Sequence, residues 1–588
     1  MRVTRPYLLC LIMACSVVVA CEQRPADPAL PVLEPHWETI QRFDSELSAE
    51  SIWASTADDV YVGWPSIEVH GDLVFGGRAR IEHFDGSSWA AIPLPLDDEY
   101  GRTSLWGSGA DNVYAALEHL YHFDGTAWRQ EPIDAGLVSG AAPDNVYAAN
   151  CGTIFHFDGA AWDTLLADTP GCVQSLAAAP DGSLFAGFYS DILRWDGATW
   201  VGTSWTSPSS TPVLLAFSAQ DAMLVQVRRI SSYSRKSDIY RWNGAQWLLE
   251  ATIPGALQAL SGESPADVFA VGDDGLVAHR DGAGWSVLSR PTGFALQAAG
   301  SFGPQALVAA GEGGKVMVYE AGTWTVLREG KIRDASIVWA ESTSRLLVAN
   351  YGLVFELNGN RWSERVLPRS TEVAAFGGRS LDDVYASTYD GSIFHYDGGA
   401  WTVAIDSVAH DLRALWMSPS GVLFTAGFGG VGRLDGTWES ILDDDVYFNV
   451  LSGAGEGRLL AAGRRAGGRA VIMYLDGASW AELLPPVVYY DITGAWLGPD
   501  GDIYVANESA LYRWDGARFE RLTPPVGGRF TAVFGVSGSR VVALGSHTAI
   551  FDGTLTNVVQ DEGHHQVAQG RDGYLISIGR SGLVAWRP

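Results

Sequence analysis

The stretch SLWGSGADNVYAALEHLYHFDGTAW, residues 104–128, decides the fold, because variants of it recur along almost the whole chain. Most variants end in Asp-Gly or Asn-Gly, followed within a few residues by a large aromatic residue. These aromatic residues are Trp89, Trp128, Trp162, Trp200, Trp247, Trp285, Trp324, Trp362, Trp401, Trp438, Trp480 and Phe519. A degenerate copy follows at Phe551, and a last copy, YLISIGRSGLVAW, reaches the C-terminus. About fourteen copies result, spaced mostly 34 to 47 residues apart.

Each copy divides into four short strands. In residues 104–128 they correspond to the LWGS, NVYAA and LYHF segments and to a strand that begins at Trp128. Apolar residues alternate or run together for a few positions between Gly, Asp, Asn and Ser, without helical periodicity. Asp-Gly between the third and fourth strands is the preferred sequence of a tight hairpin, because Gly accepts a positive φ. Four antiparallel strands in each copy predict the blade of a β-propeller.

The number of copies predicts two rings. Propellers have roughly four to eight blades, so a single ring of all copies would leave a wide hole. We therefore expect an all-β chain with two seven-bladed propellers in tandem, one at 37–330 and one at 331–588. HWETI, residues 36–40, is typical of a fourth strand without a blade before it, and the last copy lacks its fourth strand. We expect the first strand to complete the last blade; the alternative is that it closes the first ring.

The aromatic residue at the start of each fourth strand is suited to packing between blades. Burial of about 200 Å² of aromatic surface contributes roughly 5 kcal/mol before the entropic cost is counted. A ring of aromatic residues that stack on a ligand, as in a lectin, is the alternative. Recurrence in nearly every copy favours packing.

The N-terminal segment predicts export and lipid attachment. A short basic region precedes an apolar run from Tyr7 to Ala20, which is too short for a mature transmembrane helix. The run ends in VVAC, residues 18–21, which resembles the lipobox of bacterial lipoproteins. The resemblance implies cleavage before Cys21 and acylation of Cys21, and several acyl chains at about 0.8 kcal/mol per buried CH₂ give a stable anchor. An ordinary cleaved signal peptide is the alternative.

Residues 1–20 are thus the expected signal peptide, and the proline-rich residues 21–36 the expected tether. Glu22 does not match the Asp that retains lipoproteins in the inner membrane in the best-known sorting rule. The expected location is therefore the outer membrane or cell surface, with the periplasmic face as an alternative. A net charge of −29 disfavours nucleic acid and anionic lipid headgroups. We expect a monomer that contacts the membrane only through its lipid.

Two enlarged loops between second and third strands carry positive charge in this acidic chain. Arginine is suited to bidentate contact with carboxylate or phosphate. The loops are therefore candidate sites for an anionic partner, such as a polysaccharide or an acidic protein surface; solvated hairpin tips are the alternative. Their residues are Arg228, Arg229, Arg235 and Lys236 in the fifth copy, and Arg464, Arg465 and Arg469 in the eleventh.

Two cysteines besides Cys21 remain in the mature chain. Cys151 falls between the second and third strands of the third copy, and Cys172 falls before the fourth copy. Both positions belong to one face of the ring, and an exported protein meets an oxidising compartment. We therefore predict a disulfide, whose loop of some twenty residues would stabilise the fold by about 3 kcal/mol.

Motifs for catalysis, metals or cofactors are not found. His564 and His565 are the densest pair of metal-ligand types, but adjacent residues of a strand point to opposite faces. The chain has no G-x-S-x-G elbow, no HExxH and no phosphate loop. The first strands of several copies (SLWGSG, SLAAAP, ALSGES, ALWMSP) suggest a channel wall that is small and apolar. We expect no metal, no cofactor and no catalytic residues.

The W-G-S…D-V-Y-A-x-G…F-D-G-x-x-W pattern resembles the β-propeller-repeat lipoproteins of bacteria with G+C-rich genomes. It is also similar, more distantly, to the repeats of periplasmic sensor proteins and of WD-type propellers. The resemblance implies a binding or scaffolding role in the cell envelope, toward a protein or a polysaccharide. A propeller lyase or hydrolase with a site in one channel is the first alternative, and charged residues converging on a channel mouth would favour it. A ligand-sensing accessory protein is the second.

Overall fold

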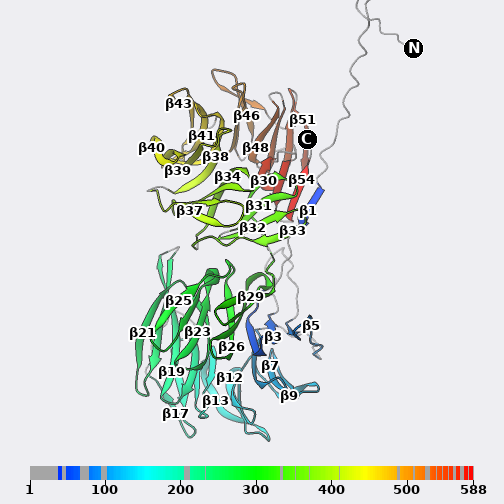
Figure 1. Ribbon diagram of the computed structural model, residues 1–588, viewed down its shortest axis with the longest axis vertical. Coiled ribbons are helices and arrows are strands. Elements are labelled where there is room, and N and C mark those ends of the chain that lie inside the picture. Colours follow the sequence, from blue (N-terminus) through cyan, green and yellow to red (C-terminus); the bar gives the residue numbers. More distant parts are fainter. Residues whose placement is uncertain are drawn as a thin grey trace, which may run out of the picture.

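The computed structural model consists almost entirely of β-strands arranged in two rings, which lie one above the other along the long axis (Figure 1). It describes residues 38–42, 48–65, 79–94, 102–203, 205, 212–231, 234–331, 335–350, 352–369, 371–408, 411–486, 491–507, 510–522, 530–537, 540–545, 547–553, 555–560, 564–569, 575–579 and 582–586. The expected signal peptide, the tether and Cys21 lie outside these residues. No helix in the described ranges is long and apolar enough to cross a membrane.

The first ring has seven blades, each a sheet of four antiparallel strands in sequential order. Blades one and two are β2 (Ser51–Thr56), β3 (Asp59–Trp64), β4 (Arg80–Phe84), β5 (Trp89–Ala91) and β6 (Ser104–Gly109), β7 (Asn112–Ala116), β8 (His119–Phe123), β9 (Trp128–Asp134). Blades three and four are β10 (Leu137–Ala142), β11 (Asn145–Ala149), β12 (Cys151–Phe157), β13 (Trp162–Cys172) and β14 (Ser175–Ala178), β15 (Leu184–Gly187), β16 (Ile192–Trp195), β17 (Trp200–Gly202). Blade five is β18 (Val213–Ser218), β19 (Asp221–Ser231), β20 (Ser234–Trp242) and β21 (Trp247–Pro254). Blades six and seven are β22 (Leu257–Ser264), β23 (Asp267–Gly272), β24 (Val277–Arg280), β25 (Trp285–Ser289) and β26 (Leu296–Gly303), β27 (Ala306–Gly311), β28 (Val316–Glu320), β29 (Thr323–Arg328), with short 3₁₀ turns η1 (Asp273–Gly275) and η2 (Glu312–Gly314).

The second ring also has seven blades. Blades eight and nine are β30 (Ile337–Ser342), β31 (Arg345–Asn350), β32 (Leu353–Asn358), β33 (Arg361–Glu364) and β34 (Val373–Ser380), β35 (Asp383–Thr388), β36 (Ile393–Tyr396), β37 (Trp401–Ile405). Blades ten and eleven share one sheet of β38 (Leu412–Met417), β39 (Leu423–Asp435), β40 (Thr437–Gly455), β41 (Arg458–Arg465), β42 (Ala470–Asp476) and β43 (Ser479–Leu483). Blades twelve and thirteen are β44 (Ile492–Leu497), β45 (Ile503–Asn507), β46 (Leu511–Trp514), β47 (Phe519–Leu522) and β48 (Phe530–Ser537), β49 (Arg540–Gly545), β50 (His547–Phe551), β51 (Leu555–Gln560). Blade fourteen joins β52 (His564–Gln569), β53 (Leu575–Gly579) and β54 (Gly582–Trp586) to β1 (Glu38–Arg42).

The shared sheet of blades ten and eleven arises because two of its strands are long. The first part of β39 pairs with β38 and its second part with β40, and Gly429 (φ 94°) lies between the two parts. The strand β40 likewise pairs with β39 before residue 444 and with β41 after it, except for the pair Phe428↔Tyr447. The strand thus serves as the last strand of one blade and the first of the next. The predicted pair of seven-bladed rings is confirmed.

The two ends of the chain meet in blade fourteen. The strand β1 pairs antiparallel with β54, from Glu38 opposite Ala585 to Arg42 opposite Gly582. In Figure 1 the blue first strand accordingly lies beside the red last one. This pairing confirms that the first strand completes the last blade. The first propeller therefore begins at β2 and not at residue 37, because residues 38–42 belong to the second ring.

The first ring closes without help from a terminal strand. Its last blade packs directly against its first, with Ile52 and Val60 in one buried cluster with Val308 and Val316. The indole Nε1 of Trp89 donates a hydrogen bond to the carbonyl oxygen of Leu327, 3.4 Å away. Fourth-strand tryptophans therefore hold neighbouring blades together, as their recurrence predicts.

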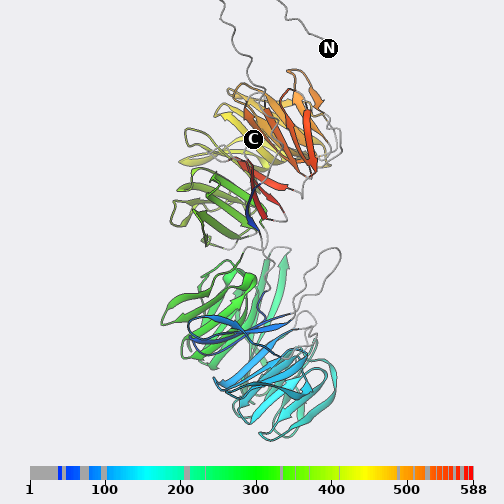
Figure 2. The same cartoon turned by 90° about the vertical axis from the view of Figure 1, so that its right-hand side faces the viewer.

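The rings contact each other through the ends of blades six to eight (Figure 2). Phe294, between β25 and β26, is buried in a cluster of the second ring, with its ring centroid 5.6 Å from that of Phe355. Glu364 of β33 accepts hydrogen bonds from Thr292 Oγ1 at 2.7 Å and from the backbone N of Gly293 at 2.6 Å. The buried Nζ of Lys315 lies 3.2 Å from the same carboxylate. This buried pair is expected to fix one ring against the other.

Candidate functional site

The second ring encloses a central cavity of about 460 Å³. The first strands of six blades line it, namely β30, β34, β38, β40, β44 and β48. A cavity of this size falls within the roughly 300–1,000 Å³ that is typical of small-molecule sites. We take it as the candidate functional site and call it the channel.

Four large aromatic residues line the channel at one level. Trp339, Trp416, Trp496 and Phe534 occupy the same position in the first strands of blades eight, ten, twelve and thirteen. All four are partly exposed. Among the residues that the structure describes, none accepts a hydrogen bond from the indole N–H of the three tryptophans, and these N–H groups are not sealed in the interior. They are donors available to a molecule in the channel.

Two of these indoles lie flat on a glycine of the next blade. A Cβ added to Gly453 would lie 2.7 Å from Cδ2, Cε2 and Cε3 of Trp416 alike, which places the glycine under the face of the ring. A Cβ on Gly535 would lie 1.9 Å from Cζ2 of Trp496 and 2.1 Å from its Cε2. Both indoles also line the channel and are partly exposed. The glycine of the W-G-S motif thus makes room for the tryptophan of the preceding blade.

Polar side chains enter the channel at β-bulges. The pairing with the second strand shifts register between Leu412 and Ala414, and at the matching point in blades eleven, twelve and thirteen. A bulge re-aims the side chain of the extra residue. These extra residues are Arg413, Asn449, Thr493 and Thr531, and all four line the channel.

Arg413 lies at the mouth of the channel, and its guanidinium group is hydrogen-bonded to neighbouring side chains. The Nε and Nη2 atoms of Arg413 donate to Asp411 Oδ2 at 3.0 and 2.8 Å, and its Nη1 donates to Asn449 Oδ1 at 3.4 Å. The guanidinium carbon lies 5.7 Å from the ring centroids of both Tyr389 and Tyr447. Burial, followed by the charge of Glu372, raises the pKa of Tyr389, so this phenol keeps its proton at neutral pH.

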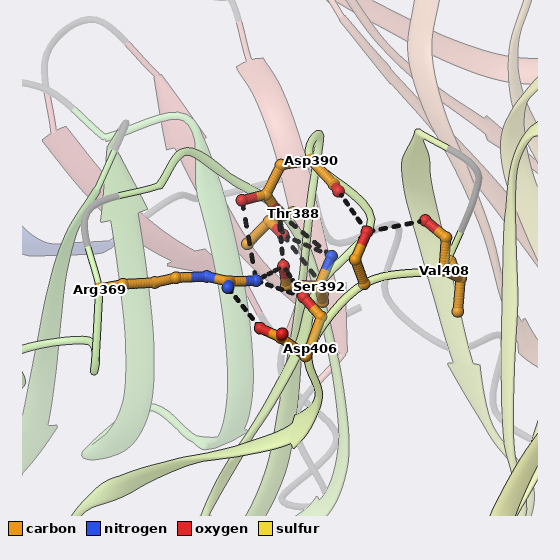
Figure 3. A network of polar contacts seen from close by, with 7 residues as sticks. Arg369, Thr388, Asp390, Ser392, Asp406 and Val408 are labelled. Carbon is orange, nitrogen blue, oxygen red and sulfur yellow. Dashed lines mark hydrogen bonds and ion pairs between the residues drawn. The ribbon is translucent and has the colours of Figure 1, made fainter. Parts of the chain in front are cut away.

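The turn that carries Tyr389 is held by a network of polar contacts (Figure 3). Asp390 Oδ1 accepts hydrogen bonds from the hydroxyls of Thr388 at 2.5 Å and Ser392 at 2.7 Å. Burial opposes ionisation of Asp390, but these hydrogen bonds prevail and lower its pKa. The Oγ atom of Ser392 also lies 2.7 Å from the carbonyl oxygen of Asp406, whose carboxylate binds Arg369. The mouth is thus preorganised on the side of blade nine.

The expectation of a small, apolar channel wall is wrong for the second ring. The bulges shift the alternation of inward and outward residues by one, so Arg413 and Asn449 enter a wall that simple alternation would leave apolar. One sequence signal was available: an aromatic residue recurs at the same point in IVWAES, RALWM, TGAWL and AVFGV.

Carboxylates of blades five and six pair with two of the four basic residues in the loop of blade five. Arg228 pairs with Asp238 through two nitrogens, and these hydrogen bonds lower the pKa of Asp238. Arg235 lies 2.6 Å from Asp273 of the next blade. Arg229 donates to the carbonyl oxygen of Ser231. Lys236 is exposed on β20, opposite Arg228.

The basic loop of blade eleven, which belongs to the other ring, is also paired. Arg464 lies 3.3 Å from Asp491. Arg465 binds both Asp444 and Glu482, and Arg469 lies 3.9 Å from Glu482. An anionic partner would have to displace these carboxylates, and anion binding by either loop stays a prediction.

Cys151 and Cys172 are joined by a disulfide within blade three, with an S–S distance of 2.06 Å. They are paired residues of β12 and β13, at the ends of a long hairpin. Elsewhere in the described part of the chain, no three His, Cys, Asp or Glu side chains are placed to hold a metal ion. The side chains of His564 and His565 lie outside what the structure describes.

Comparison with known proteins finds similar folds but no family. No protein-family model and no curated protein matches the chain. A similar solved structure is PorZ of Porphyromonas gingivalis, a surface component of the type-IX secretion system, at 12% identity over 94% of this chain and 87% of that one, with a TM-score of 0.42. The extracellular domain of a one-component system of B. thetaiotaomicron matches at 10% identity over 94% and 82%, with a TM-score of 0.36. Virginiamycin B lyase of Staphylococcus aureus matches at 10% identity over 43% of this chain and 94% of the lyase, with a TM-score of 0.38. These activities and assemblies are those of the proteins named.

Proposed function

We propose that this protein is a lipid-anchored protein of the cell envelope that binds a ligand in the channel of its second propeller. One observation carries the proposal: aromatic side chains surround a cavity of about 460 Å³, together with indole N–H groups that donate to none of the described residues. Ligand sites are concave, mostly apolar and furnished with a few polar groups that fix orientation. The channel has this composition. The arginines of the two basic loops that already pair with carboxylates make these loops weaker candidates for the ligand site.

The anchor in this proposal is Cys21, with residues 21–36 as the tether. The strand β1 follows this segment and belongs to the second ring, so the proposed anchor leads directly into the propeller that carries the channel. Metabolic labelling with radioactive palmitate tests the anchor. Label on the wild type and none on Cys21→Ser is the expected result; equal label on both contradicts it.

The binding role is tested by filling the channel. The soluble form starting at Glu22 is used as bait to capture partners from detergent-solubilised cell envelope. The same experiment is done with the variant Asn449→Trp. Asn449 lines the channel, and among the described residues its side chain is held by Arg413 alone, at 3.4 Å. A bulky side chain there is therefore expected to block entry and abolish capture. Gln297→Trp is the matched control, since Gln297 stands at a bulge of the first ring. Equal capture by wild type and Asn449→Trp would contradict the proposal.

An enzyme acting in the same channel is the second candidate, because Arg413, Asp411, Tyr389 and Tyr447 converge on its mouth. Such convergence is what a propeller lyase or hydrolase requires. We favour binding because Arg413 and Asp411 are bonded to each other. The captured component is incubated with the wild-type protein and with the variant Arg413→Ala. Cleavage into shorter products by the wild type alone would favour the enzyme.

A further inference from the structure

We propose that the ligand of the channel is a neutral oligosaccharide. This inference rests on the proposed binding function and narrows it to one class of molecule. Three properties of the channel carry it: the aromatic faces, the donors that lack partners, and the charge around the mouth.

The aromatic faces suit sugar rings. Trp416 and Trp496 each cover a glycine with one face and line the channel while partly exposed, and Trp339 and Phe534 line it at the same level. The C–H groups on one side of a pyranose ring form a flat apolar surface with partial positive charge. Such a surface packs well on the negative face of an aromatic ring. Several such faces around one channel match a chain of sugars better than a single small metabolite.

The polar groups require a ligand rich in acceptors. Within the described residues, the indole N–H groups of Trp339, Trp416 and Trp496 donate to no protein atom. A hydrocarbon ligand such as an acyl chain would remove these donors from water and leave them unpaired, which is unfavourable. Sugar hydroxyls accept hydrogen bonds beside an apolar ring surface, so they satisfy the donors while the rings stack.

The charge around the mouth disfavours acidic ligands. Among the described residues, Arg413 is the one cationic side chain that lines the channel. Its charge is already neutralised by Asp411, whose Oδ2 lies 2.8 Å from Nη2 of Arg413. The net charge of −29 repels uronate, sulfate and phosphate groups as they approach. A neutral glycan fits where an acidic one does not.

The test uses the soluble form starting at Glu22 on a printed array of neutral and acidic glycans, followed by calorimetric titration of the strongest neutral binder. We expect a neutral oligosaccharide to bind. Trp416→Ala and Trp496→Ala should each weaken binding about tenfold or more, and Trp416→Phe, which keeps an aromatic face but loses the N–H, should weaken it less. Trp53→Ala and Trp106→Ala are matched controls, because these indoles cover Gly107 and Gly140 in the first ring in the same way. They should leave the affinity unchanged.

The contradicting outcomes are distinct. Binding to no neutral glycan, or to acidic glycans alone, overturns the assignment to neutral oligosaccharides. The broader binding function survives such a result if Asn449→Trp still abolishes capture from the envelope, and fails if it does not. Glycan binding that is lost in Trp53→Ala but kept in Trp416→Ala and Trp496→Ala would place the site in the other ring and overturn the proposal.

Discussion

At the scale of single residues, the tryptophan of one first strand and the glycine of the next form a unit across the blade boundary. We predict that Gly453→Ala destabilises the second ring, because the new Cβ would lie 2.7 Å from the Trp416 ring. Overpacking of this kind costs about 1–3 kcal/mol. Gly455→Ala is the control two residues further on β40, where nothing lies within 4 Å of the added Cβ. Thermal unfolding followed by circular dichroism measures the difference; equal midpoints for the two variants would refute the packing.

At the scale of the element, the hairpin between third and fourth strands depends on an ionised aspartate. Asp124 Oδ1 accepts a hydrogen bond from the hydroxyl of Thr126 and from the backbone N of Thr126 and Ala127, and Gly125 takes φ 82°. These hydrogen bonds, that of the Thr126 hydroxyl first, lower the pKa of Asp124 to about 2. The stabilisation is therefore complete above the ordinary pKa of 3.8 and is lost as the pH falls toward about 2.

Asparagine performs the same role without titrating, as Asn243 shows in blade five by accepting from the backbone N of Ala245 and Gln246. We predict that Asp124→Asn is as stable as the wild type at pH 7 and loses less stability between about pH 4 and pH 2. Thermal midpoints at a series of pH values measure this. Parallel pH profiles for the two proteins would show that Asp124 does not contribute to the acid sensitivity.

The blades could be predicted from the sequence, whereas the channel walls and the ion pairs of the basic loops could not. The hairpin turns and the fourth-strand tryptophans are local signals, so Trp128, Gly125 and the blade they define can be recognised directly. The walls of the channel depend on where each first strand bulges, which is set by pairing with the second strand and leaves no local mark at Arg413 or Asn449. The carboxylates that neutralise the basic loops come partly from other strands or the next blade, as Asp273 does for Arg235, and only the fold brings them together.

At the scale of the whole molecule, the two rings share one architecture but close differently. The first closes through packing of blade seven on blade one, whereas the second requires β1 from the other end of the chain. The strand β1, near the N-terminus, is therefore built into the ring with the channel. The rings differ in how many aromatic residues stand at this first-strand position. The first ring has Trp53 and Trp106, whereas the second has Trp339, Trp416, Trp496 and Phe534, with Gly377 and Ser452 there in blades nine and eleven. This difference supports the proposal that the ligand binds in the second ring.

Hydroxyl-radical footprinting with mass spectrometry tests that assignment most directly, because oxidation of an aromatic side chain reports its access to solvent. The wild-type protein is compared with and without a saturating concentration of the neutral glycan that it binds. The account predicts that the ligand lowers oxidation of Trp416, Trp496 and Phe534 and leaves Trp53 and Trp106 unchanged. Protection confined to the first ring or to the loop segments 228–236 and 464–469, with the channel residues still oxidised at their original rates, would contradict it.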